Sequence, residues 1–354
     1  MKQQPGKIAF LGSGETAAAG GKIYEHLAAQ LNSPLQVSVL ETPAGFELNA
    51  AQVAGRVTDY LRVRLQNYHP KVHQIGALRR GNPGGTDDPE LLRPLLTSQL
   101  IFLGPGSPSY TVRQLQHSLA WQIILARVLS GASLALASAA VIASGTLSLP
   151  VYEIYKVGED PFWKPGLDLP GLLGLKLVFF PHWNNRDGGE ELDTRFCFMG
   201  APRLSELLRQ LQTGVNMLGI DEHTALVLDL AESTASVLGV GTVTIFARQP
   251  YQQVFHSGQQ FPLNLLGDFH IPANLEPWIS ASVAEMLATS DADPLANRLE
   301  QPDEAVLLLL EERRLARAQQ NWQRADQLRD LLLGQGWQVL DTAQGQVIQK
   351  SKTG

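Results

Sequence analysis

Three side chains suited to hydrolytic chemistry follow apolar, strand-like runs at separate places in the sequence. The first is Ser138, which comes directly after the run Leu134–Ala137 and before a small-residue helix start. A strand–serine–helix turn exposes the hydroxyl above a sheet and aims the next backbone N–H groups at a developing oxyanion. However, Leu136 and Ala140 stand where such an elbow usually has glycine. A buried structural serine is therefore the competing interpretation.

A histidine and several carboxylates could complete a nucleophilic group. His182 follows the run Leu177–Phe180, a position suited to a general base, although backbone groups beneath Trp183 could equally satisfy its ring. Glu222, beside Asp221, ends another strand-like run and could orient an imidazole. A helix cap or a surface acid is the alternative for Glu222. Two further acids could compete for its role, namely Asp187 and Asp193.

A glycine-containing turn after the first apolar run offers a different chemistry. Residues Gly12–Ala17 fit a G-x-G-x-x-A dinucleotide-binding pattern, with Glu41 as a candidate ribose partner. A tight turn that packs a helix on a sheet explains the same glycines. The segment Thr16–Lys22 does not match a phosphate-binding loop, because Thr16 replaces the first glycine of that motif.

The remaining composition excludes several classes of protein. The single cysteine, Cys197, rules out a disulfide framework, and its aromatic neighbours are typical of an inert buried thiol. No spacing of His, Cys, Asp and Glu predicts a metal site, and we expect no cofactor. The net charge of −6 argues against general electrostatic attraction to nucleic acid or to an anionic membrane. Met1–Gly6 shows no signal-peptide core, and Ala132–Val151 fits a buried strand and turn better than a membrane span. We therefore expect a cytoplasmic protein.

The candidate residues stand among apolar runs of four to eight residues, each followed by Gly or Pro and then by a helical pattern. These runs are Ile8–Leu11, Val37–Leu40, Leu100–Leu103, Leu134–Ala137 and Leu177–Phe180. They predict an α/β fold of three layers, with a mainly parallel sheet covered on both faces. An open α/β sheet places its site at the carboxyl ends of such strands. Later short strands, over 224–230, 237–246 and 254–265, predict an antiparallel extension of the same sheet.

The 354 residues suggest about two domains. Residues 1–270 form the predicted α/β domain, and the Pro-, Asn- and Ser-containing stretch 271–300 reads as a linker. From 301 to 354 the pattern is helical and charged, which predicts a small helical hairpin module followed by a strand and a turn.

The motifs of the first domain together resemble the cyanophycinase/aspartyl dipeptidase (dipeptidase E-like) family of serine peptidases, which has the class I glutamine amidotransferase-like, flavodoxin-like fold. Leu11–Glu15 resembles the turn that follows the first strand in the family, and Gly104–Ser107 resembles its G-G-[DN]-x loop. Ser138–Ala140 resembles the S-A-G nucleophile elbow, Pro181-His182 the segment with the base, and Gly219–Leu226 the family's G-I-D-E-N-T-A-L.

The resemblance, which extends over roughly residues 7 to 250, implies a Ser138 nucleophile, a His182 general base and a Glu222 orienting acid. It also implies an oxyanion hole made by the backbone N–H groups of Gly106 and Ala139. Such peptidases cleave peptide bonds involving aspartyl residues without a metal or organic cofactor. A glutamine amidotransferase is disfavoured, since that chemistry uses a cysteine at the elbow.

By the same resemblance, a substrate pocket would include Gly14, Glu15, Ser107 and Trp183. Pro105 departs from the family's loop, so substrate recognition could differ. The stretch Pro150–Gly158, with Trp163 and Asp168 beyond it, has no counterpart in the resemblance, and we expect it beside the site.

The C-terminal segment resembles the C-terminal module of cysteinyl-tRNA synthetase. Arg324–Asp330 matches its R-A-D-x-[IL]-R-D helix, and Asp341–Gly345 matches its D-T-x-x-G turn. The zinc site and the HIGH and KMSKS signatures of a synthetase are absent from the sequence. The segment is either a packing or assembly module or an RNA-contacting one. Candidate phosphate contacts are Arg313, Arg317, Arg324 and Arg329.

Two functions remain open from the sequence. The first is a serine hydrolase that cleaves a small peptide or related amide, with aspartyl substrates suggested, through an acyl-enzyme. The second is a catalytically inactive amidotransferase-like binding protein whose tail contacts tRNA. The sequence leaves the oligomeric state undecided, with a homodimer as one option.

Overall fold

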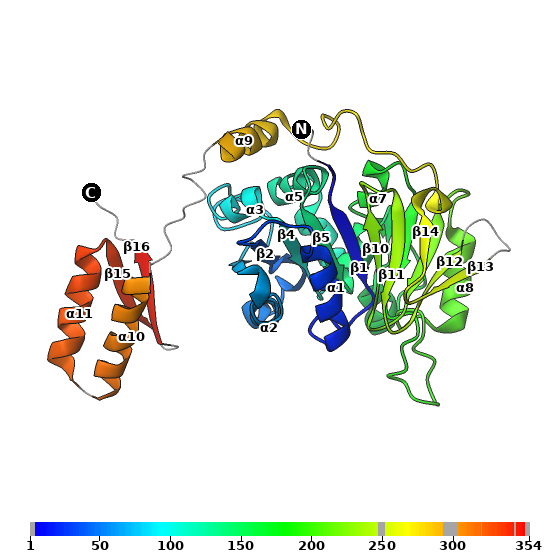
Figure 1. Ribbon diagram of the computed structural model, residues 1–354. Helices are drawn as coiled ribbons and strands as arrows, with labels where there is room; N and C mark the ends of the chain where they lie inside the picture. Colours follow the sequence, from blue (N-terminus) through cyan, green and yellow to red (C-terminus); the bar gives the residue numbers. More distant parts are fainter. Residues whose placement is uncertain (1–3, 247–251, 293–303, 320, 343–344, 351–354) are drawn as a thin grey trace. The chain divides into compact units, whose positions relative to one another are not determined.

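The computed structural model describes residues 4–246, 252–292, 304–319, 321–342 and 345–350 (Figure 1). The chain forms two compact units, Met1–Asp291 and Ala292–Gly354. Among the described residues, no helix has both the length and the apolar character needed to cross a bilayer.

The first unit is built on an eight-stranded sheet with the order β14-β11-β10-β1-β5-β4-β2-β3. Five neighbouring strands run parallel: β1 (Lys7–Leu11), β5 (Ser133–Ala137), β4 (Leu100–Leu103), β2 (Gln36–Leu40) and β3 (Lys71–Ile75). The prediction of an α/β fold with a mainly parallel sheet is confirmed. Because these strands are parallel, their carboxyl ends meet at one edge, where the candidate site lies.

Both faces of the parallel strands are covered. Alternate residues of β1 enter different hydrophobic clusters, with Phe10 on one face and Leu11 on the other. One face packs against α1 (Ala18–Ala28) and α2 (Ala50–Arg64). The opposite face packs against α3 (Arg93–Thr97) and α5 (Leu119–Leu129). Burial on both sides explains why these strands are continuously apolar instead of alternating.

The antiparallel extension differs from the prediction. The strands β10 (Thr224–Asp229), β11 (Thr234–Gly239) and β14 (Gln260–Pro262) extend the main sheet. The ranges 237–246 and 254–265 were each expected to contribute to that one sheet, but each divides between two sheets. The backbone changes direction at Gly239, whose φ of +116° favours glycine.

The second sheet has four strands, in the order β13-β12-β9-β8. These are β13 (Gln252–His256), β12 (Thr242–Phe246), β9 (Asn216–Ile220) and β8 (Leu177–Phe180). The assignment of Leu177–Phe180 to the main sheet was therefore wrong. Instead, β8 pairs in parallel with β9, and its Phe180 belongs to a separate cluster that also contains Leu207 of α8 (Gly200–Gln210). Its Phe179 stacks on Phe10 of β1 with ring centroids 4.4 Å apart.

Short elements complete the first unit. The helices among them are α4 (Pro108–Leu115), α6 (Ala139–Ser144), α7 (Leu169–Leu172) and α9 (Ala281–Ala292), with a π-helical turn at Glu153–Val157 and 3₁₀ turns at Thr42–Ala44, Gln66–Tyr68 and Leu263–Leu266. A small ribbon joins β6 (Leu147–Ser148) and β7 (Lys164–Pro165). The range predicted as a linker contains α9, whose Val283 is fully buried against the core. Residues 293–300 of that range lie outside the described residues.

The second unit contains α10 (Glu304–Ala318), α11 (Trp322–Gly334) and an antiparallel pair of strands, β15 (Trp337–Thr342) and β16 (Gly345–Lys350). Its small core combines side chains of both helices and of β15, namely Val306, Leu332, Trp337 and Val339. Residues 343–344 of the predicted D-T-x-x-G turn lie outside the described residues.

The Phe10–Phe179 stack should contribute to the stability of the first unit. We expect Phe10→Ala to lower the free energy of unfolding by about 3–5 kcal/mol, because it leaves a cavity between the two sheets. Leu48→Ala, at a fully exposed side chain, should change it by less than about 0.5 kcal/mol. Urea unfolding measures both values, and equal effects of the two substitutions would contradict this account of the core.

Candidate active site

Ser138 occupies a strained turn between β5 and α6. Its φ of +50° and ψ of −110° are unusual for a residue with a side chain. Its backbone N–H donates to Leu11 O over 3.3 Å. Leu136 and Ala140, which stand where such a turn usually has glycine, are both buried within the adjoining core. The strand–serine–helix geometry predicted from the sequence is therefore present.

The structure brings Ser138, His182 and Glu222 into one hydrogen-bonded chain. Ser138 Oγ lies 3.0 Å from His182 Nε2, and His182 Nδ1 lies 2.9 Å from Glu222 Oε1. When Nδ1 carries the proton, it donates to the carboxylate and leaves Nε2 free to accept from the serine hydroxyl. The hydrogen bond from His182 lowers the pKa of Glu222, so this carboxyl is ionised at neutral pH.

The turn after β1, residues 11–14, contacts the segments that carry the serine and the histidine. Leu11 O accepts from the Ser138 N–H, and Gly12 O accepts from the His182 N–H over 3.2 Å. The carboxyl ends of β1, β5 and β8 are thereby joined through backbone groups. We call residues 11–14 the first-strand turn.

The first-strand turn also holds the segment that carries the acid. Gly12 N–H donates to Thr224 O over 2.8 Å, and Ser13 Oγ accepts from the His223 N–H over 3.3 Å. A Cβ added to Gly12 would lie 2.1 Å from Asp221 O, so only glycine permits this approach. These contacts account for the glycine-containing turn without a dinucleotide. Glu41, the candidate ribose partner, is 7% exposed and accepts from Gln74 Nε2.

The loop that contains Gly106 lies at the end of β4, the strand next to β5. Gly106 has a φ of +151°, and a Cβ there would lie 1.9 Å from Pro43 O. Ser107 N–H donates to that same carbonyl over 3.0 Å. Ala139 is the first residue of α6, a position whose N–H has no acceptor within its own helix. Gly106 and Ala139 thus lie at neighbouring strand ends, as an oxyanion hole would require.

The other residues expected in a substrate pocket have different surroundings. Ser107 Oγ accepts from the Tyr110 N–H and caps α4. Trp183 is only 9% exposed and packs on Phe196 with ring centroids 4.3 Å apart. Glu15 is partly buried. Gly14 has a φ of +76°, and a Cβ added there would lie 2.2 Å from His223 Nδ1.

The remaining acids have partners of their own. Asp221 Oδ2 accepts from both the N–H and the hydroxyl of Thr242, which fixes the start of β12. Asp193 pairs with Arg195, and that hydrogen bond lowers the pKa of Asp193 to about 2. Asp187 donates its backbone N–H to Asn185 Oδ1. Among the described hydrogen bonds, the partner of His182 Nδ1 is Glu222.

Cys197 lies beneath the site. Burial raises the pKa of its thiol to about 12, and the nearby charge of Glu222 adds to the shift. Its neighbours Phe196 and Phe198 share its left-handed backbone, with φ of +61° and +66°. The N–H of Cys197 donates to His182 O, so this unusual turn supports the histidine segment from below.

Two asparagines that were not predicted from the sequence hold the acid. Asn184 Oδ1 accepts from the Glu222 N–H over 2.8 Å, and Asn185 Nδ2 donates to Glu222 Oε1 over 3.1 Å. The available signal was their place immediately after His182-Trp183, since side chains that follow a strand end lie beside those of neighbouring strand ends.

Tyr155 and Trp163 belong to the stretch that has no counterpart in the family resemblance, and they lie in two different environments. Tyr155 packs on Phe198 with centroids 5.2 Å apart, and Phe198 lies 6.3 Å from the His182 ring. The π-helical turn is therefore connected to the site. Trp163 instead donates to Leu207 O, beside α8.

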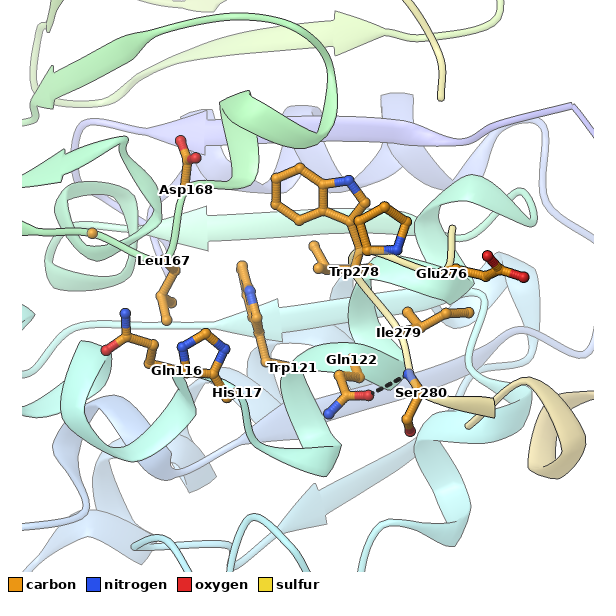
Figure 2. Close-up of a pocket in the computed structure, with 13 residues that line it drawn as sticks. Gln116, His117, Trp121, Gln122, Leu167, Asp168, Glu276, Trp278, Ile279 and Ser280 are labelled. Atoms are coloured by element: carbon orange, nitrogen blue, oxygen red, sulfur yellow. Dashed lines mark hydrogen bonds between the residues drawn. The ribbon is translucent and has the colours of Figure 1, made fainter. Parts of the chain in front are cut away.

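Asp168 lines a different pocket, of about 430 Å³, between α5 and the segment before α9 (Figure 2). The side chains of Trp121 and Trp278 contribute to its walls, and Gln122 Oε1 accepts from the Ser280 N–H over 2.7 Å. None of its lining residues belongs to the Ser–His–Glu chain. In the part of the chain described, no cluster of His, Cys, Asp and Glu could hold a metal ion.

The strain at Ser138 predicts a gain in stability on substitution by glycine. We expect Ser138→Gly to raise the free energy of unfolding by about 1 kcal/mol, because glycine adopts a positive φ without strain. The control Ser205→Gly, in the middle of α8, should lower it by about 0.5–1 kcal/mol. A Ser138→Gly protein that unfolds at lower urea concentration than the wild type would refute the strain argument.

The lowered pKa of Glu222 predicts a pH-dependent contribution to stability. This contribution is present above the ordinary carboxyl pKa of 4.5 and is lost as the pH falls through the lower value of the folded protein. The stability difference between wild type and Glu222→Gln should therefore shrink as the pH falls from about 6 toward 3. Urea unfolding at several pH values measures it, with the exposed Glu232→Gln as control. A difference that does not vary with pH would disprove the coupling.

The similarities to known proteins concern the fold of the chain and the sequence of a small part of it. No protein-family profile matches the sequence. A peptidase from an acI-B1 Actinobacterium superposes with a TM-score of 0.58 at 21% identity, covering 74% of this chain and 98% of that one. A candidate peptidase E from Listeria monocytogenes EGD-e gives a TM-score of 0.43 at 12% identity over 71% of this chain and 98% of its own, too low to support an argument.

A stretch of 72 residues is 35% identical to the cysteine–tRNA ligase of Oenococcus oeni. The match covers 20% of this chain and 15% of that ligase, so it concerns a small part of both proteins. The superposition with the actinobacterial structure covers most of this chain. This chain shares its fold with that structure.

Proposed function

We propose that this protein is a serine-type hydrolase that cleaves a peptide or a related amide. The observation that carries the proposal is the unbroken hydrogen-bonded chain from Ser138 Oγ through His182 to Glu222. A nucleophile, a base within hydrogen-bond reach and a group that orients the base are the parts that nucleophilic catalysis requires. The fold that the chain shares with an actinobacterial peptidase supports the same class of reaction.

In the proposed reaction, Ser138 Oγ attacks the substrate carbonyl and transfers its proton to His182 Nε2. Glu222 stabilises the imidazolium, and the N–H groups of Gly106 and Ala139 bind the oxyanion of the tetrahedral intermediate. Collapse of the intermediate releases the amine with a proton from His182. Water, activated by His182, then hydrolyses the acyl-enzyme and restores the serine hydroxyl.

The proposed substrates follow from the resemblance of the motifs to cyanophycinases and aspartyl dipeptidases. We therefore propose a class I glutamine amidotransferase-like fold and an aspartyl-containing peptide or amide as substrate. The serine at the elbow agrees with a peptidase, whereas a glutamine amidotransferase would need a cysteine there. Because Pro105 departs from the family's loop, the preference for particular substrate side chains has to be measured.

A second candidate function concerns the C-terminal unit, and the match to a cysteine–tRNA ligase favours it. In this alternative the unit contacts tRNA while the first unit is catalytically inactive. The surroundings of the arginines give it limited support. Arg313 is buried and donates to Gln346, while Arg324 and Arg329 pair with Glu312 and Asp326. Such pairing reduces the positive charge offered to phosphates.

The experiment that tests the proposed function is hydrolysis of a panel of α- and β-aspartyl dipeptides and other amides. We expect wild-type turnover of at least one substrate and a loss of about a thousandfold or more in Ser138→Ala, because the nucleophile is removed. Ser205→Ala, on the exposed side of α8, should retain the wild-type rate.

Equal hydrolysis by wild type and Ser138→Ala would disprove the serine mechanism. Absence of hydrolysis, together with salt-sensitive tRNA binding that is lost on truncation at Asn297, would favour the second candidate.

A further inference from the structure

Asn185 is a buried polar residue that contacts the acid of the Ser–His–Glu chain. It is 1% exposed, and its Nδ2 donates to Glu222 Oε1 over 3.1 Å. The same oxygen receives the hydrogen bond of His182 Nδ1. One carboxylate oxygen is therefore held by two donors. A buried amide needs such partners, because leaving it unpaired would cost its full desolvation free energy.

The orientation of the Asn185 amide is fixed by its surroundings. Its Oδ1 accepts from the Asp187 N–H over 3.1 Å, and its own N–H donates to His182 O over 3.2 Å. Exchanging Oδ1 and Nδ2 would place the amide oxygen against the Glu222 carboxylate and the amide NH2 group against the Asp187 N–H. Only the orientation that donates to Glu222 satisfies both contacts.

The neighbouring asparagine fixes the backbone of the same acid. Asn184 Oδ1 accepts from the Glu222 N–H, so both ends of this residue are held by side chains from the histidine segment. His182 is thus linked to Glu222 directly and also through the residues that follow it. If the Glu222 carboxylate were free to rotate, the imidazole that it holds could turn away from Ser138 Oγ.

We infer that Asn185 is a positioning residue for the reaction, acting on His182 through the Glu222 carboxylate. The inference rests on the proposed function. Its competitor is a purely structural role, in which Asn185 only closes the turn to Asp187 through Oδ1. The two roles use different atoms of one amide, and this makes them separable by substitution.

Two variants change these contacts, and the first is Asn185→Asp, which has the same shape. It keeps an oxygen for the Asp187 N–H but replaces the donor to Glu222 with a second carboxylate oxygen. Asn185→Ala removes both contacts. Either role predicts that Asn185→Ala is impaired, and Asn185→Asp also brings a second negative charge against Glu222. The comparison that separates the two roles is therefore Asn185→Ala with and without the Glu222 carboxylate.

The readout is the rate at which a fluorophosphonate labels the folded protein, which needs no knowledge of the substrate. In that reaction the Ser138 Oγ–P bond forms, the P–F bond breaks, fluoride leaves and the serine proton passes to His182. Circular dichroism and thermal unfolding confirm that each variant is folded at the assay temperature.

We expect Asn185→Ala and Asn185→Asp each to slow labelling about tenfold or more, as loss of a hydrogen bond to a charged group would. In a Glu222→Gln background, Asn185→Ala should slow it by less than about twofold, because the group through which Asn185 acts is already changed. Wild-type labelling by Asn185→Asp, or an equal loss with and without Glu222, would overturn the inference alone. A wild-type protein that is not labelled would overturn the proposed function and the inference with it.

Discussion

The candidate site depends on a backbone contact that leaves no space for a side chain. Gly12 approaches the carbonyl of Asp221 so closely that an added Cβ would lie 2.1 Å from its oxygen. The first-strand turn can therefore bond to the serine segment, the histidine segment and the acid segment at once, through the N–H groups of Ser138, His182 and His223. Three stretches far apart in sequence are brought to hydrogen-bond distance by one short turn, and this permits a Ser–His–Glu chain without flexible connections.

Packing below the turn makes this contact rigid. The strand β1 (Lys7–Leu11) is buried on both faces, and its Phe10 stacks on Phe179 of β8 (Leu177–Phe180). This stack joins the two sheets shortly before the strand ends that the His182–Gly12 hydrogen bond connects. The same rigidity sustains the positive φ of Ser138, since a strained residue persists only where its surroundings determine its conformation. The packing of the core therefore also determines the geometry of the site.

The sequence predicted the parts of the structure that depend on local pattern. Continuous apolar runs indicated the parallel strands, and their carboxyl ends indicated where Ser138 and His182 lie. It could not show which sheet a strand joins, because Leu177–Phe180 has the same apolar character in either place. It also could not show that Asn185 donates to Glu222, since an asparagine after a strand end has many ordinary uses. The catalytic roles remain predictions that the observed geometry supports.

Covalent labelling can identify which residue of the folded protein reacts as a nucleophile. After treatment of the full chain with a fluorophosphonate, peptide mapping by tandem mass spectrometry locates the covalent adduct. We expect a single adduct on Ser138 in the folded protein and none after denaturation, because only the assembled Ser–His–Glu chain activates the hydroxyl. An adduct on another residue, or equal labelling of folded and denatured protein, would contradict it.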